Sequence, residues 1–411
     1  MIASLLWKKP SRLLNIPEIN DVQLVKDVIT HLWWAVSTLW NKTIEIVPSI
    51  TRRDIPNEFG AKSRASALFI GPLIAKFGKV SIPLPWWDKL WARPLDRLML
   101  GLEAMGCTWT MEWQRVLIEA PQWLHGTTYR FEKNTHTGTE MLMMAATLAK
   151  GTTILENAAL EPEIDDMIVF LNAMGAKIRR RAFRTIEIEG VESLDSAIHS
   201  VIPDRNVAVT YACAALISRG DIIIENARHQ DLTAFLQKLD EAWWWYEIGD
   251  RWMRFFWKWP LKATDIETKP EPWFMTDWQA LWAVLMCTAE WCSIIHETIF
   301  PKRFHQYTRI LEAMWARFET FDPQVDQPEW VYNFNRTPEM VWWHYAIKIY
   351  GPVSFKGWTF MLDDLRAWAT ALLAWLVWSW VTILENIEQI DRWYERLDES
   401  FRKMWANIVR K

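Results

Sequence analysis

Glycine is scarce in this chain. It contributes 14 of 411 residues, roughly half the share that is usual in soluble proteins. A protein of this length must make many tight turns, and glycine is the residue that enters the φ > 0 region without strain. Some other residue must therefore occupy many of the positions where glycine is normally found.

Cysteine and histidine are also few and dispersed. The four cysteines (Cys107, Cys213, Cys287 and Cys292) show no CxxC spacing, and none of the eight histidines belongs to an HExxH pair. This pattern excludes a disulfide framework and predicts neither a metal site nor a cofactor. Free cysteines are typical of a reducing compartment, so we expect a cytoplasmic protein.

An excess of positive charge is missing as well. The chain carries 46 Lys and Arg against 50 Asp and Glu, for a net charge of −4. It therefore lacks the basic footprint of a nucleic-acid-binding protein. The start, MIASLLWKKP, places its apolar stretch before the lysines, in the wrong order for a signal peptide.

Only Ala367–Leu384 imitates a membrane span, with 18 residues and no charge. Two internal equivalents, MLMMAATLAKGTTIL and VTYACAALISRGDIII, are interpreted as helix, turn and strand. We expect the same here, and no membrane partner.

Tryptophan, in contrast, occurs 31 times, and its positions follow an internal repeat. Six units of one strand–helix–turn pattern each open and close on Gly or Trp. Their openers and closers are Trp7 and Trp33, Gly78 and Gly106, Gly151 and Gly175, Gly220 and Trp243, Trp291 and Trp315, and Trp380 and Trp405. The closer follows an amphipathic helix, where a residue with φ > 0 is required.

A bulky aromatic residue is strained at such a position, whereas glycine is not. We interpret many of these tryptophans as glycine codons read with the wrong genetic code, in which TGA is translated as Trp instead of Gly. A chain that is truly rich in tryptophan is the alternative. Gene triplets of TGG at these turns would favour it.

The repeats also predict the fold class. β-Branched runs such as TTILEN and DIIIEN alternate with helical patterns, which indicates an α/β protein built from an array of six units. Three units precede the stretch Glu189–Pro203 and three follow it. We expect two domains, 1–202 and 203–411, with a hinge in that stretch and a ligand cleft between them.

Charged residues outside the repeat pattern are the candidates for chemistry. The segment IPLPWWDKLWARPLDR contains Asp88, Arg93, Asp96 and Arg97, and it would form a mobile loop (83–97) if its tryptophans were glycines. A hydroxyl-rich run from Lys133 starts a helix, and such a start can bind an anion. Further candidates are Arg64, Asp277, Arg303, Arg366 and Arg392. Recurring arginines favour a ligand with phosphate or carboxylate groups.

Several segments together resemble one known family. LPWWDKLWARPLD, the block from LMMAATLAKGTTILEN to LNAMGAKI, TDWQA, DLRA and IDRWYER are similar to the UDP-N-acetylglucosamine enolpyruvyl transferases over nearly the whole chain. The resemblance implies two inverse α/β prism domains of three repeats each. It also implies transfer of an enolpyruvyl group from phosphoenolpyruvate to the 3-hydroxyl of UDP-N-acetylglucosamine, with release of phosphate. This is the first committed step of peptidoglycan synthesis.

The resemblance assigns roles residue by residue. It implies that Asp277 is the base toward the hydroxyl, that Asp88 occupies the acid position, and that Arg93, Arg366 and Arg392 surround phosphoenolpyruvate. The other substrate contacts that it implies are Arg64, Pro94, Leu95, Asp96, Arg97, Lys133, Asn134, Thr135, His136, Ile299 and Arg303. The family has glycine at Trp86, Trp87, Trp91, Trp291, Trp315, Trp393 and Trp405, and it tolerates a large apolar residue at Trp278.

Three departures from the family pattern bear on function. Asp88 stands where most members have cysteine, and Leu98 where many have histidine. The family's catalytic Lys-Asn segment has no equivalent before MIASLL, which we interpret as a start codon placed too late. Two alternatives remain: a 3-phosphoshikimate enolpyruvyl transferase, and a non-catalytic homologue that only binds nucleotide sugar.

Overall fold

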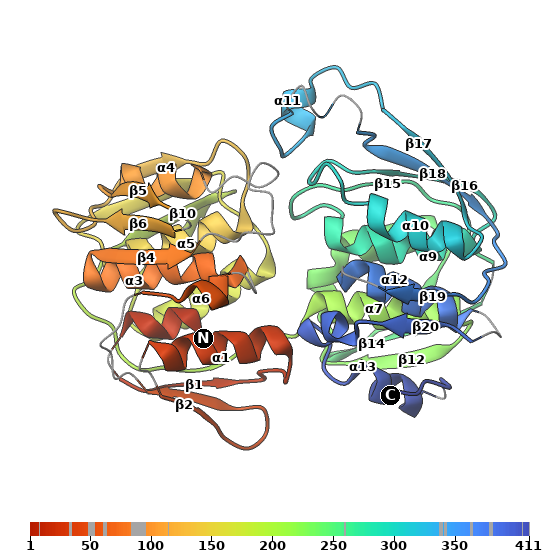
Figure 1. Cartoon of the computed structure of the whole chain (residues 1–411), viewed down its shortest axis with the longest axis horizontal. Helices are drawn as coiled ribbons and strands as arrows, with labels where there is room; N and C mark the ends of the chain where they lie inside the picture. The colour runs from red at the N-terminus through yellow and green to blue at the C-terminus, as the bar shows by residue number, and fades with distance from the viewer. Residues whose placement is uncertain are drawn as a thin grey trace. The chain divides into compact units, whose positions relative to one another are not determined.

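The structure is a computed structural model. It describes residues 1–7, 9–32, 35–47, 54–60, 64–83, 96–113, 115–258, 260–336, 340, 343–361, 365–377, 381–404 and 406–410, without the side chains of residues 60, 64, 96, 365 and 366. The chain divides into two compact units, Met1–Ile202 and Pro203–Lys411. Each unit is described by itself (Figure 1).

In the first unit, the described residues form three sheets and the helices that cover them. The sheets have the strand orders β11-β1-β3-β2, β4-β6-β5 and β7-β8-β10-β9. The strands are β1 Ser11–Leu14, β2 Ala35–Thr38, β3 Ile44–Val47, β4 Lys79–Pro83, β5 Thr108–Glu112, β6 Arg115–Glu119, β7 Thr128–Arg130, β8 Thr152–Glu156, β9 Lys177–Ala182, β10 Thr185–Glu189 and β11 Ile198–Ser200. The helices are η1 Ile2–Leu6, α1 Asn20–His31, α2 Asn57–Gly60, η2 Arg64–Phe69, α3 Ile70–Phe77, α4 Asp96–Ala104, α5 His136–Ala146 and α6 Pro162–Ala173.

The second unit repeats this plan among its described residues. Its sheets are β12-β14-β13, β15-β16-β18-β17 and β19-β20. The strands are β12 Asp221–Glu225, β13 Trp245–Ile248, β14 Trp252–Phe256, β15 Ile266–Glu267, β16 Trp291–His296, β17 Arg317–Phe321, β18 Ala346–Gly351, β19 Thr359–Met361 and β20 Ile383–Glu385. The helices are α7 Arg205–Ile217, η4 His229–Leu232, α8 Thr233–Glu241, η5 Thr276–Trp278, α9 Gln279–Thr288, α10 His305–Ala313, α11 Pro328–Val331, α12 Leu365–Leu376, η7 Ile387–Arg392 and α13 Leu397–Lys403.

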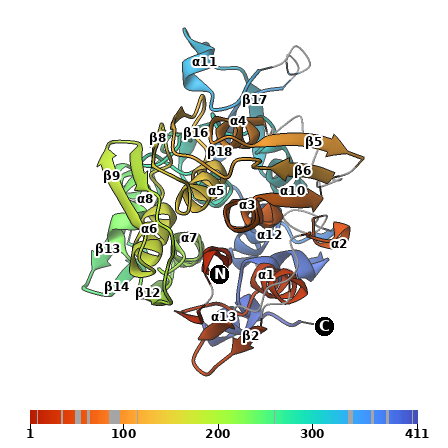
Figure 2. The same ribbon diagram turned by 90° about the vertical axis from the view of Figure 1, so that its left-hand side faces the viewer.

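Buried helices occupy the centre of each unit. In the first unit, α3 and α5 pack side by side between the sheets (Figure 2). In the second, every residue of α9 from Gln279 to Cys287 is buried. A helix that is apolar on all sides needs protein around it, whereas strands such as β8 bury alternate residues and cover the helices with one face. The resulting core of each unit is continuous.

The expected helix-turn-strand segments are confirmed. α5 leads into β8, and α7 leads into β12. Within the uncharged run Ala367–Leu384, α12 extends to Leu376 and β20 begins at Ile383, and residues 378–380 between them lie outside the described residues. No helix among the described residues has the length and apolar character needed to cross a membrane.

The stretch Glu189–Pro203, expected as a hinge, is partly regular structure. β11 lies within it and pairs in parallel with β1, with Arg12 opposite Ile198. Most of the stretch therefore belongs to the first unit, and the division of the chain falls after Ile202.

The left-handed backbone expected at the repeat closers is confirmed wherever the closer is described. Gly106 and Gly175 have φ of 93° and 100°, and Trp243 and Trp315 have φ of 64° and 78°. Each closer donates its N–H three residues back, and the next residue donates five residues back, as in Trp315 to Glu312 and Ala316 to Leu311. This is one helix-ending motif, which glycine normally occupies.

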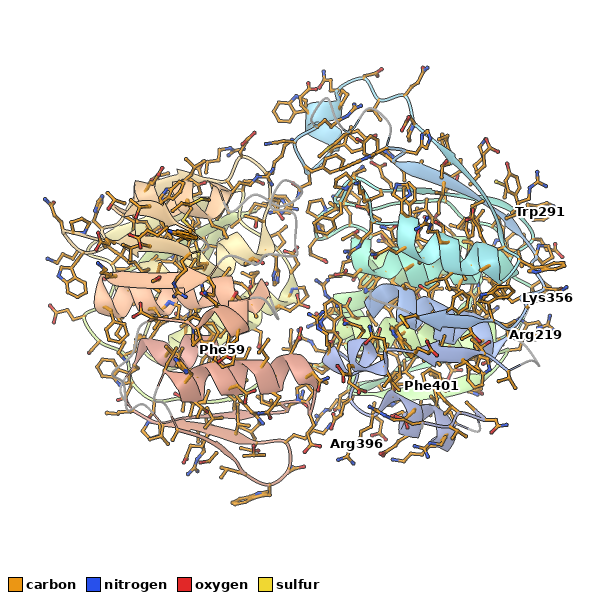
Figure 3. All side chains as sticks on the ribbon, viewed as in Figure 1. Phe59, Arg219, Trp291, Lys356, Arg396 and Phe401 are labelled. Carbon is orange, nitrogen blue, oxygen red and sulfur yellow. The ribbon has the colours of Figure 1, made fainter. Side chains whose placement is uncertain are left out.

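The tryptophans at left-handed positions lie in solvent. Trp243, Trp291 and Trp315 are 61%, 66% and 62% exposed, and Figure 3 labels Trp291 at the outer edge of its unit. Their indoles therefore gain little from burial that could offset the backbone strain. Trp393, another family glycine position, has φ of −125° and carries no such strain. Trp33, Trp86, Trp87, Trp91 and Trp405 lie outside the described residues.

Trp278 behaves in the opposite way, because it is 1% exposed. Its Nε1 donates to Asn206 Oδ1 at 2.9 Å, and its ring packs edge-on against Phe235 and Phe274. The buried site accommodates a large side chain, in agreement with the family's tolerance of a large apolar residue there.

Candidate active site

Asp277, the expected base, lies in η5 immediately before the buried helix α9. Arg303 precedes α10 and donates through its guanidinium to Asp277 Oδ1. Both side chains are largely buried, with Arg303 at 6% exposure and Asp277 at 18%. The fold thus brings together two expected site residues that lie 26 positions apart in the sequence.

Glu297 is a buried acidic residue near Asp277 that the sequence reasoning missed. It follows β16, and its side chain is fully buried. One carboxylate oxygen accepts hydrogen bonds from Thr276 Oγ1 at 2.8 Å and from Gln279 Nε2. One sequence feature could have indicated Glu297. It follows a buried β-branched run, and a carboxylate in such a place needs several hydrogen-bond donors around it.

The other carboxylate oxygen of Glu297 holds Ile299. It accepts from the backbone N–H groups of Ile299 and Phe300 at 2.6 and 2.7 Å. Glu297 therefore joins the turn that carries Ile299, the expected sugar contact, to the η5 turn that carries Asp277. Two sequence segments, 276–279 and 297–300, are fixed relative to one another by a single side chain.

The electrostatics of Glu297 follow from its position. Burial raises the pKa of the Glu297 carboxyl, and nearby Arg303 opposes this effect. Gln279 is itself held by the buried Tyr307, whose hydroxyl donates to Gln279 Oε1 at 3.0 Å. The network therefore extends into α10 and is sensitive to loss of its central acceptor.

We expect Glu297→Ala to lower the free energy of unfolding by about 3 kcal/mol, since several buried donors lose their acceptor and each costs about 1–3 kcal/mol. Thermal denaturation followed by circular dichroism measures the change. Glu290→Ala, at an exposed position of the same unit, is the control and should change stability by less than about 0.5 kcal/mol. Equal stability of the two variants would contradict the structural role of Glu297.

In the first unit, the polar run Lys133–His136 lies at the N-terminus of α5, as expected. Thr135 caps this helix, and its hydroxyl accepts from Gly138 N–H at 3.2 Å. Asn134 is buried and donates to the Asn157 carbonyl at 3.1 Å. His136 lies 3.4 Å from Glu140, one helical turn later. The run is anchored, and it forms the helix start that the anion-site prediction requires.

Arg97 and Leu98 approach this helix start from α4. The Tyr129 hydroxyl donates to the Arg97 carbonyl at 3.0 Å. A β-carbon on Gly138 would lie 3.2 Å from the Leu98 side chain. The structure therefore brings the α4 start and the α5 start together, although 37 positions of sequence separate Leu98 from Thr135.

Of the remaining expected residues, one is described fully, some are described without their side chains and others are not described. Arg392 ends η7 and donates to Gln389 Oε1 at 3.5 Å. Arg64 begins η2, Asp96 begins α4 and Arg366 lies in α12, but their side chains are outside the described residues. Asp88, Arg93, Pro94 and Leu95 lie outside the described residues altogether, as does most of the loop 83–97.

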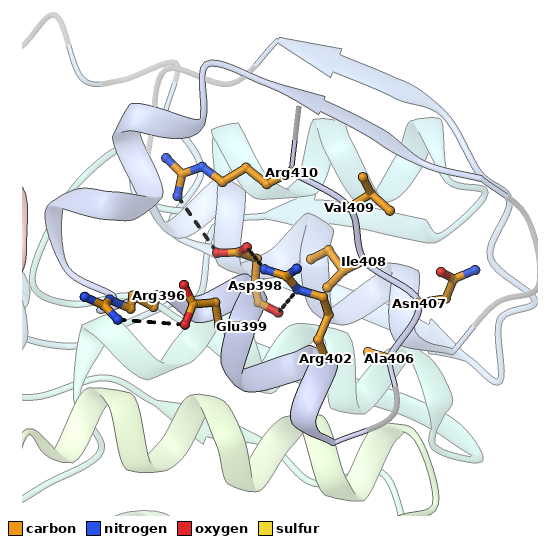
Figure 4. Close-up of a pocket in the computed structure, with 9 residues that line it drawn as sticks. All are labelled: Arg396, Asp398, Glu399, Arg402, Ala406, Asn407, Ile408, Val409 and Arg410. Carbon is orange, nitrogen blue, oxygen red and sulfur yellow. Dashed lines mark hydrogen bonds and ion pairs between the residues drawn. The ribbon is translucent and has the colours of Figure 1, made fainter.

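A separate pocket of about 730 Å³ lies near the C-terminus (Figure 4). None of the expected site residues lines it. Its arginines are engaged by carboxylates: Arg402 with Asp398 at 2.7 Å, Arg410 with Asp391 at 2.5 Å and Arg396 with Glu399 at 4.0 Å. Because its arginines are paired with carboxylates, we assign no ligand to this pocket. Across the described residues, no three His, Cys, Asp or Glu side chains gather as metal ligands.

Comparison with known proteins identifies the chain as an enolpyruvyl transferase. The sequence matches the EPSP synthase family (3-phosphoshikimate 1-carboxyvinyltransferase) over residues 1–401, and the chain belongs to this family. Among solved structures, the enolpyruvyl transferase NikO from Streptomyces tendae superimposes with a TM-score of 0.84 at 21% identity, covering 99% of this chain and 92% of that one. EPSP synthase from Acinetobacter baumannii gives a TM-score of 0.69 at 16% identity, covering 98% and 92%. The expected inverse α/β prism fold is confirmed.

Relatives with assigned names indicate which kind of enolpyruvyl transferase within this family the chain resembles. UDP-N-acetylglucosamine 1-carboxyvinyltransferase of Desulfosudis oleivorans is 35% identical over 411 residues, all of this chain and 93% of that protein. The enzyme of the same name from Salmonella gallinarum is 36% identical over 413 residues, with coverage of 100% and 92%. The resemblance found in the sequence is confirmed.

Proposed function

We propose that the protein transfers the enolpyruvyl group of phosphoenolpyruvate to the 3-hydroxyl of UDP-N-acetylglucosamine and releases phosphate. The observation that carries this proposal is the Asp277–Arg303 pair beside the Ile299 turn. It occurs in a chain that is 35% identical, along its whole length, to enzymes named for this reaction. Both substrates are small molecules.

The proposed chemistry is an addition followed by an elimination. Asp277 accepts the proton of the sugar hydroxyl, whose oxygen then attacks C2 of phosphoenolpyruvate, while Asp88 delivers a proton to C3. In the resulting tetrahedral intermediate, C3 loses a proton and the C2–O bond to phosphate breaks. The double bond is restored on the sugar ether. A carboxyl can donate the proton to C3 if its surroundings keep it protonated until the reaction.

The arginines supply positive charge where the reaction develops negative charge. Arg93, Arg366 and Arg392 are proposed to bind the phosphate and carboxylate of phosphoenolpyruvate, with Arg64 and Arg303 as further contacts. Forked guanidinium groups match both anions, and fixed cations stabilise the transition state. In this arrangement, Arg303 also holds the Asp277 carboxylate in place.

The nucleotide sugar is proposed to bind through two sets of residues. Lys133, Asn134, Thr135 and His136 at the α5 start contact the diphosphate and the ring, with help from the helix N-terminus. Pro94, Leu95, Asp96 and Arg97 hold the uridine end, and Ile299 packs against the sugar. The packing of α4 against α5 supports a shared site for the two sets within this unit.

Asp88 leads to a prediction about inhibition. Epoxides that alkylate a cysteine at the acid position should not inactivate this protein, because a carboxyl forms no thioether. Asp88→Cys should gain time-dependent inactivation and a covalent mass increase on the peptide that contains residue 88. Labelling of the unaltered protein at Asp88 would contradict the prediction. Cys292, the exposed free cysteine, serves as the internal control for nonspecific alkylation.

A phosphate-release assay with phosphoenolpyruvate tests the proposed function. UDP-N-acetylglucosamine should support turnover, and 3-phosphoshikimate should not. Turnover with 3-phosphoshikimate alone would select the second candidate, which the description of the matched family favours. Binding of UDP-N-acetylglucosamine without turnover would identify a non-catalytic homologue. With activity confirmed, the protein would act in the cytoplasm at the first committed step of peptidoglycan synthesis, on which cell shape and division depend.

A further inference from the structure

One hairpin of the molecule is far longer than the others. Strands β2 and β3, β5 and β6, β9 and β10, and β13 and β14 are joined by two to five residues (39–43, 113–114, 183–184 and 249–251). The equivalent strands β17 and β18 are joined by residues 322–345, which we call the long connection. Connections of more than about 12–15 residues inside a compact domain usually have a function of their own.

The described part of the long connection has its own small core. Tyr332, Phe334, Met340 and Tyr345 are buried together, and their aromatic rings lie 5.0–5.5 Å apart. The Arg336 guanidinium covers the Tyr332 and Tyr345 rings at 5.6 and 5.4 Å. Figure 1 shows α11, which belongs to this connection, clear of α9 and α10 in the same unit. The segment is therefore a folded addition to the sheet.

The long connection packs on the turn that carries Ile299. Asn333 N–H donates to the Thr298 carbonyl at 2.7 Å, and Glu297 N–H donates to the Tyr345 carbonyl at 2.8 Å. The Tyr332 hydroxyl lies 3.3 Å from His296 Nε2. Lys302 lies over the Trp343 ring at 3.8 Å. The long connection therefore contacts the backbone of Glu297 and Thr298, just before Ile299, and the side chain of Lys302 after it.

The opposite side of the same turn is held by the Glu297 carboxylate, which links it to Thr276 beside Asp277. The turn that carries Ile299 is therefore hydrogen-bonded to the long connection and linked through Glu297 to the η5 turn. Hydrogen bonds to the Glu297 carboxylate and backbone hydrogen bonds with the long connection limit how far this turn can move. A contact that is held in advance of binding loses less entropy when the ligand arrives.

We propose that the long connection is a specificity-determining segment, which positions Ile299 and so sets the affinity for the sugar of the nucleotide-sugar acceptor. This inference rests on the proposed function. It concerns the acceptor, because the contacts above involve the turn that carries Ile299, the proposed contact to the sugar.

Shortening the connection tests the proposal. Replacing residues 322–345 with Asn-Gly gives the two-residue turn that matches the twist of paired strands. We expect the KM for UDP-N-acetylglucosamine to rise by about tenfold or more and the KM for phosphoenolpyruvate to stay within about twofold, because only a ground-state contact to the acceptor is weakened. An unchanged KM for the acceptor, or an equal rise in both values, overturns the proposal.

A point variant covers the case in which the shortened chain does not fold. Tyr332→Ala removes the centre of the small core and the contact with His296, and it should raise the acceptor KM selectively. Tyr332→Phe keeps the ring, loses only the hydroxyl and should recover most of the affinity. Trp330→Ala, at an 80% exposed position of the same segment, is the control without effect. Equal KM values for Tyr332→Ala and Trp330→Ala would overturn the proposal.

Titration calorimetry with UDP-N-acetylglucosamine distinguishes a failure of the proposed function from a failure of the role of the long connection. An unaltered protein that neither turns over nor binds this ligand rejects the proposed function itself. An unaltered protein that binds it, together with a shortened chain that binds it equally well, rejects the role of the long connection alone.

Discussion

Asp277→Asn should lower kcat by about 10²–10⁴-fold, the usual contribution of a positioned general base. The amide keeps the size of the carboxylate but cannot accept the proton of the sugar hydroxyl. The side-chain oxygen can still accept from Arg303, so we expect the fold and the acceptor KM to change little. Initial rates of phosphate release measure the effect.

The matched control is Asp250→Asn, which makes the same chemical change at an exposed position in the turn between β13 and β14. It should keep the activity of the unaltered protein. A loss of less than about tenfold for Asp277→Asn would remove Asp277 from the base position. A lost thermal transition in that variant would indicate that the residue mainly supports the fold.

The second large effect is expected from the strained tryptophans. The triple variant Trp243→Gly, Trp291→Gly, Trp315→Gly should raise the free energy of unfolding of the second unit by about 3–6 kcal/mol, since a left-handed backbone costs a residue with a β-carbon about 1–2 kcal/mol. Such a gain corresponds to a melting temperature higher by roughly 10 °C for a unit of this size. Scanning calorimetry measures it.

Two cation–π contacts work against this gain. Lys262 lies 5.3 Å from the centre of the Trp243 ring. Lys356 lies 3.2 Å from the centre of the Trp315 ring, and an exposed cation–π contact contributes about 0.5–1 kcal/mol. The single variant Trp315→Gly should therefore stabilise the unit less than Trp291→Gly. Trp278→Gly is the opposite control, because it empties a buried site and should destabilise by about 3–5 kcal/mol. A triple variant no more stable than the unaltered chain would contradict the strain argument.

The same positions test the genetic-code hypothesis. Peptides of the protein from its native cell should have masses that correspond to glycine at residues 243, 291 and 315, and to tryptophan at residue 278. Tryptophan at all four would show that the strained residues are genuine. The backbone strain at residues 243, 291 and 315 would then be a cost that the native chain tolerates.

Much of the fold could be predicted because the repeat is local. The β-branched runs, the amphipathic helices and the left-handed closers each follow from residues close together in the sequence, such as Gly151 to Gly175. The buried helices could also be predicted, since α5 and α7 are apolar on all sides. The strand β11 could not, because three residues pair with a strand that lies 186 positions earlier in the chain.

The site was predicted less completely. Residue types and resemblance suggested Asp277, Arg303 and the run from Lys133 to His136, and their roles stay a prediction. Glu297 was missed because its role depends on donors from Thr276 and Gln279, which only the folded chain brings to it. The long connection was missed because nothing in its composition indicates that it would form a small core against the Ile299 turn.

The sequence by itself determined the six-fold repeat, the α/β class, the turns that require glycine-like backbone and the family. These are short-range properties, encoded by periodicity and by the allowed φ of single residues. Only the tertiary structure decided that Asp277 meets Arg303, that Glu297 ties their segments to Ile299, and that the long connection packs beside them. Such contacts join residues far apart in the chain, and their geometry depends on how the buried helices and sheets of each unit pack.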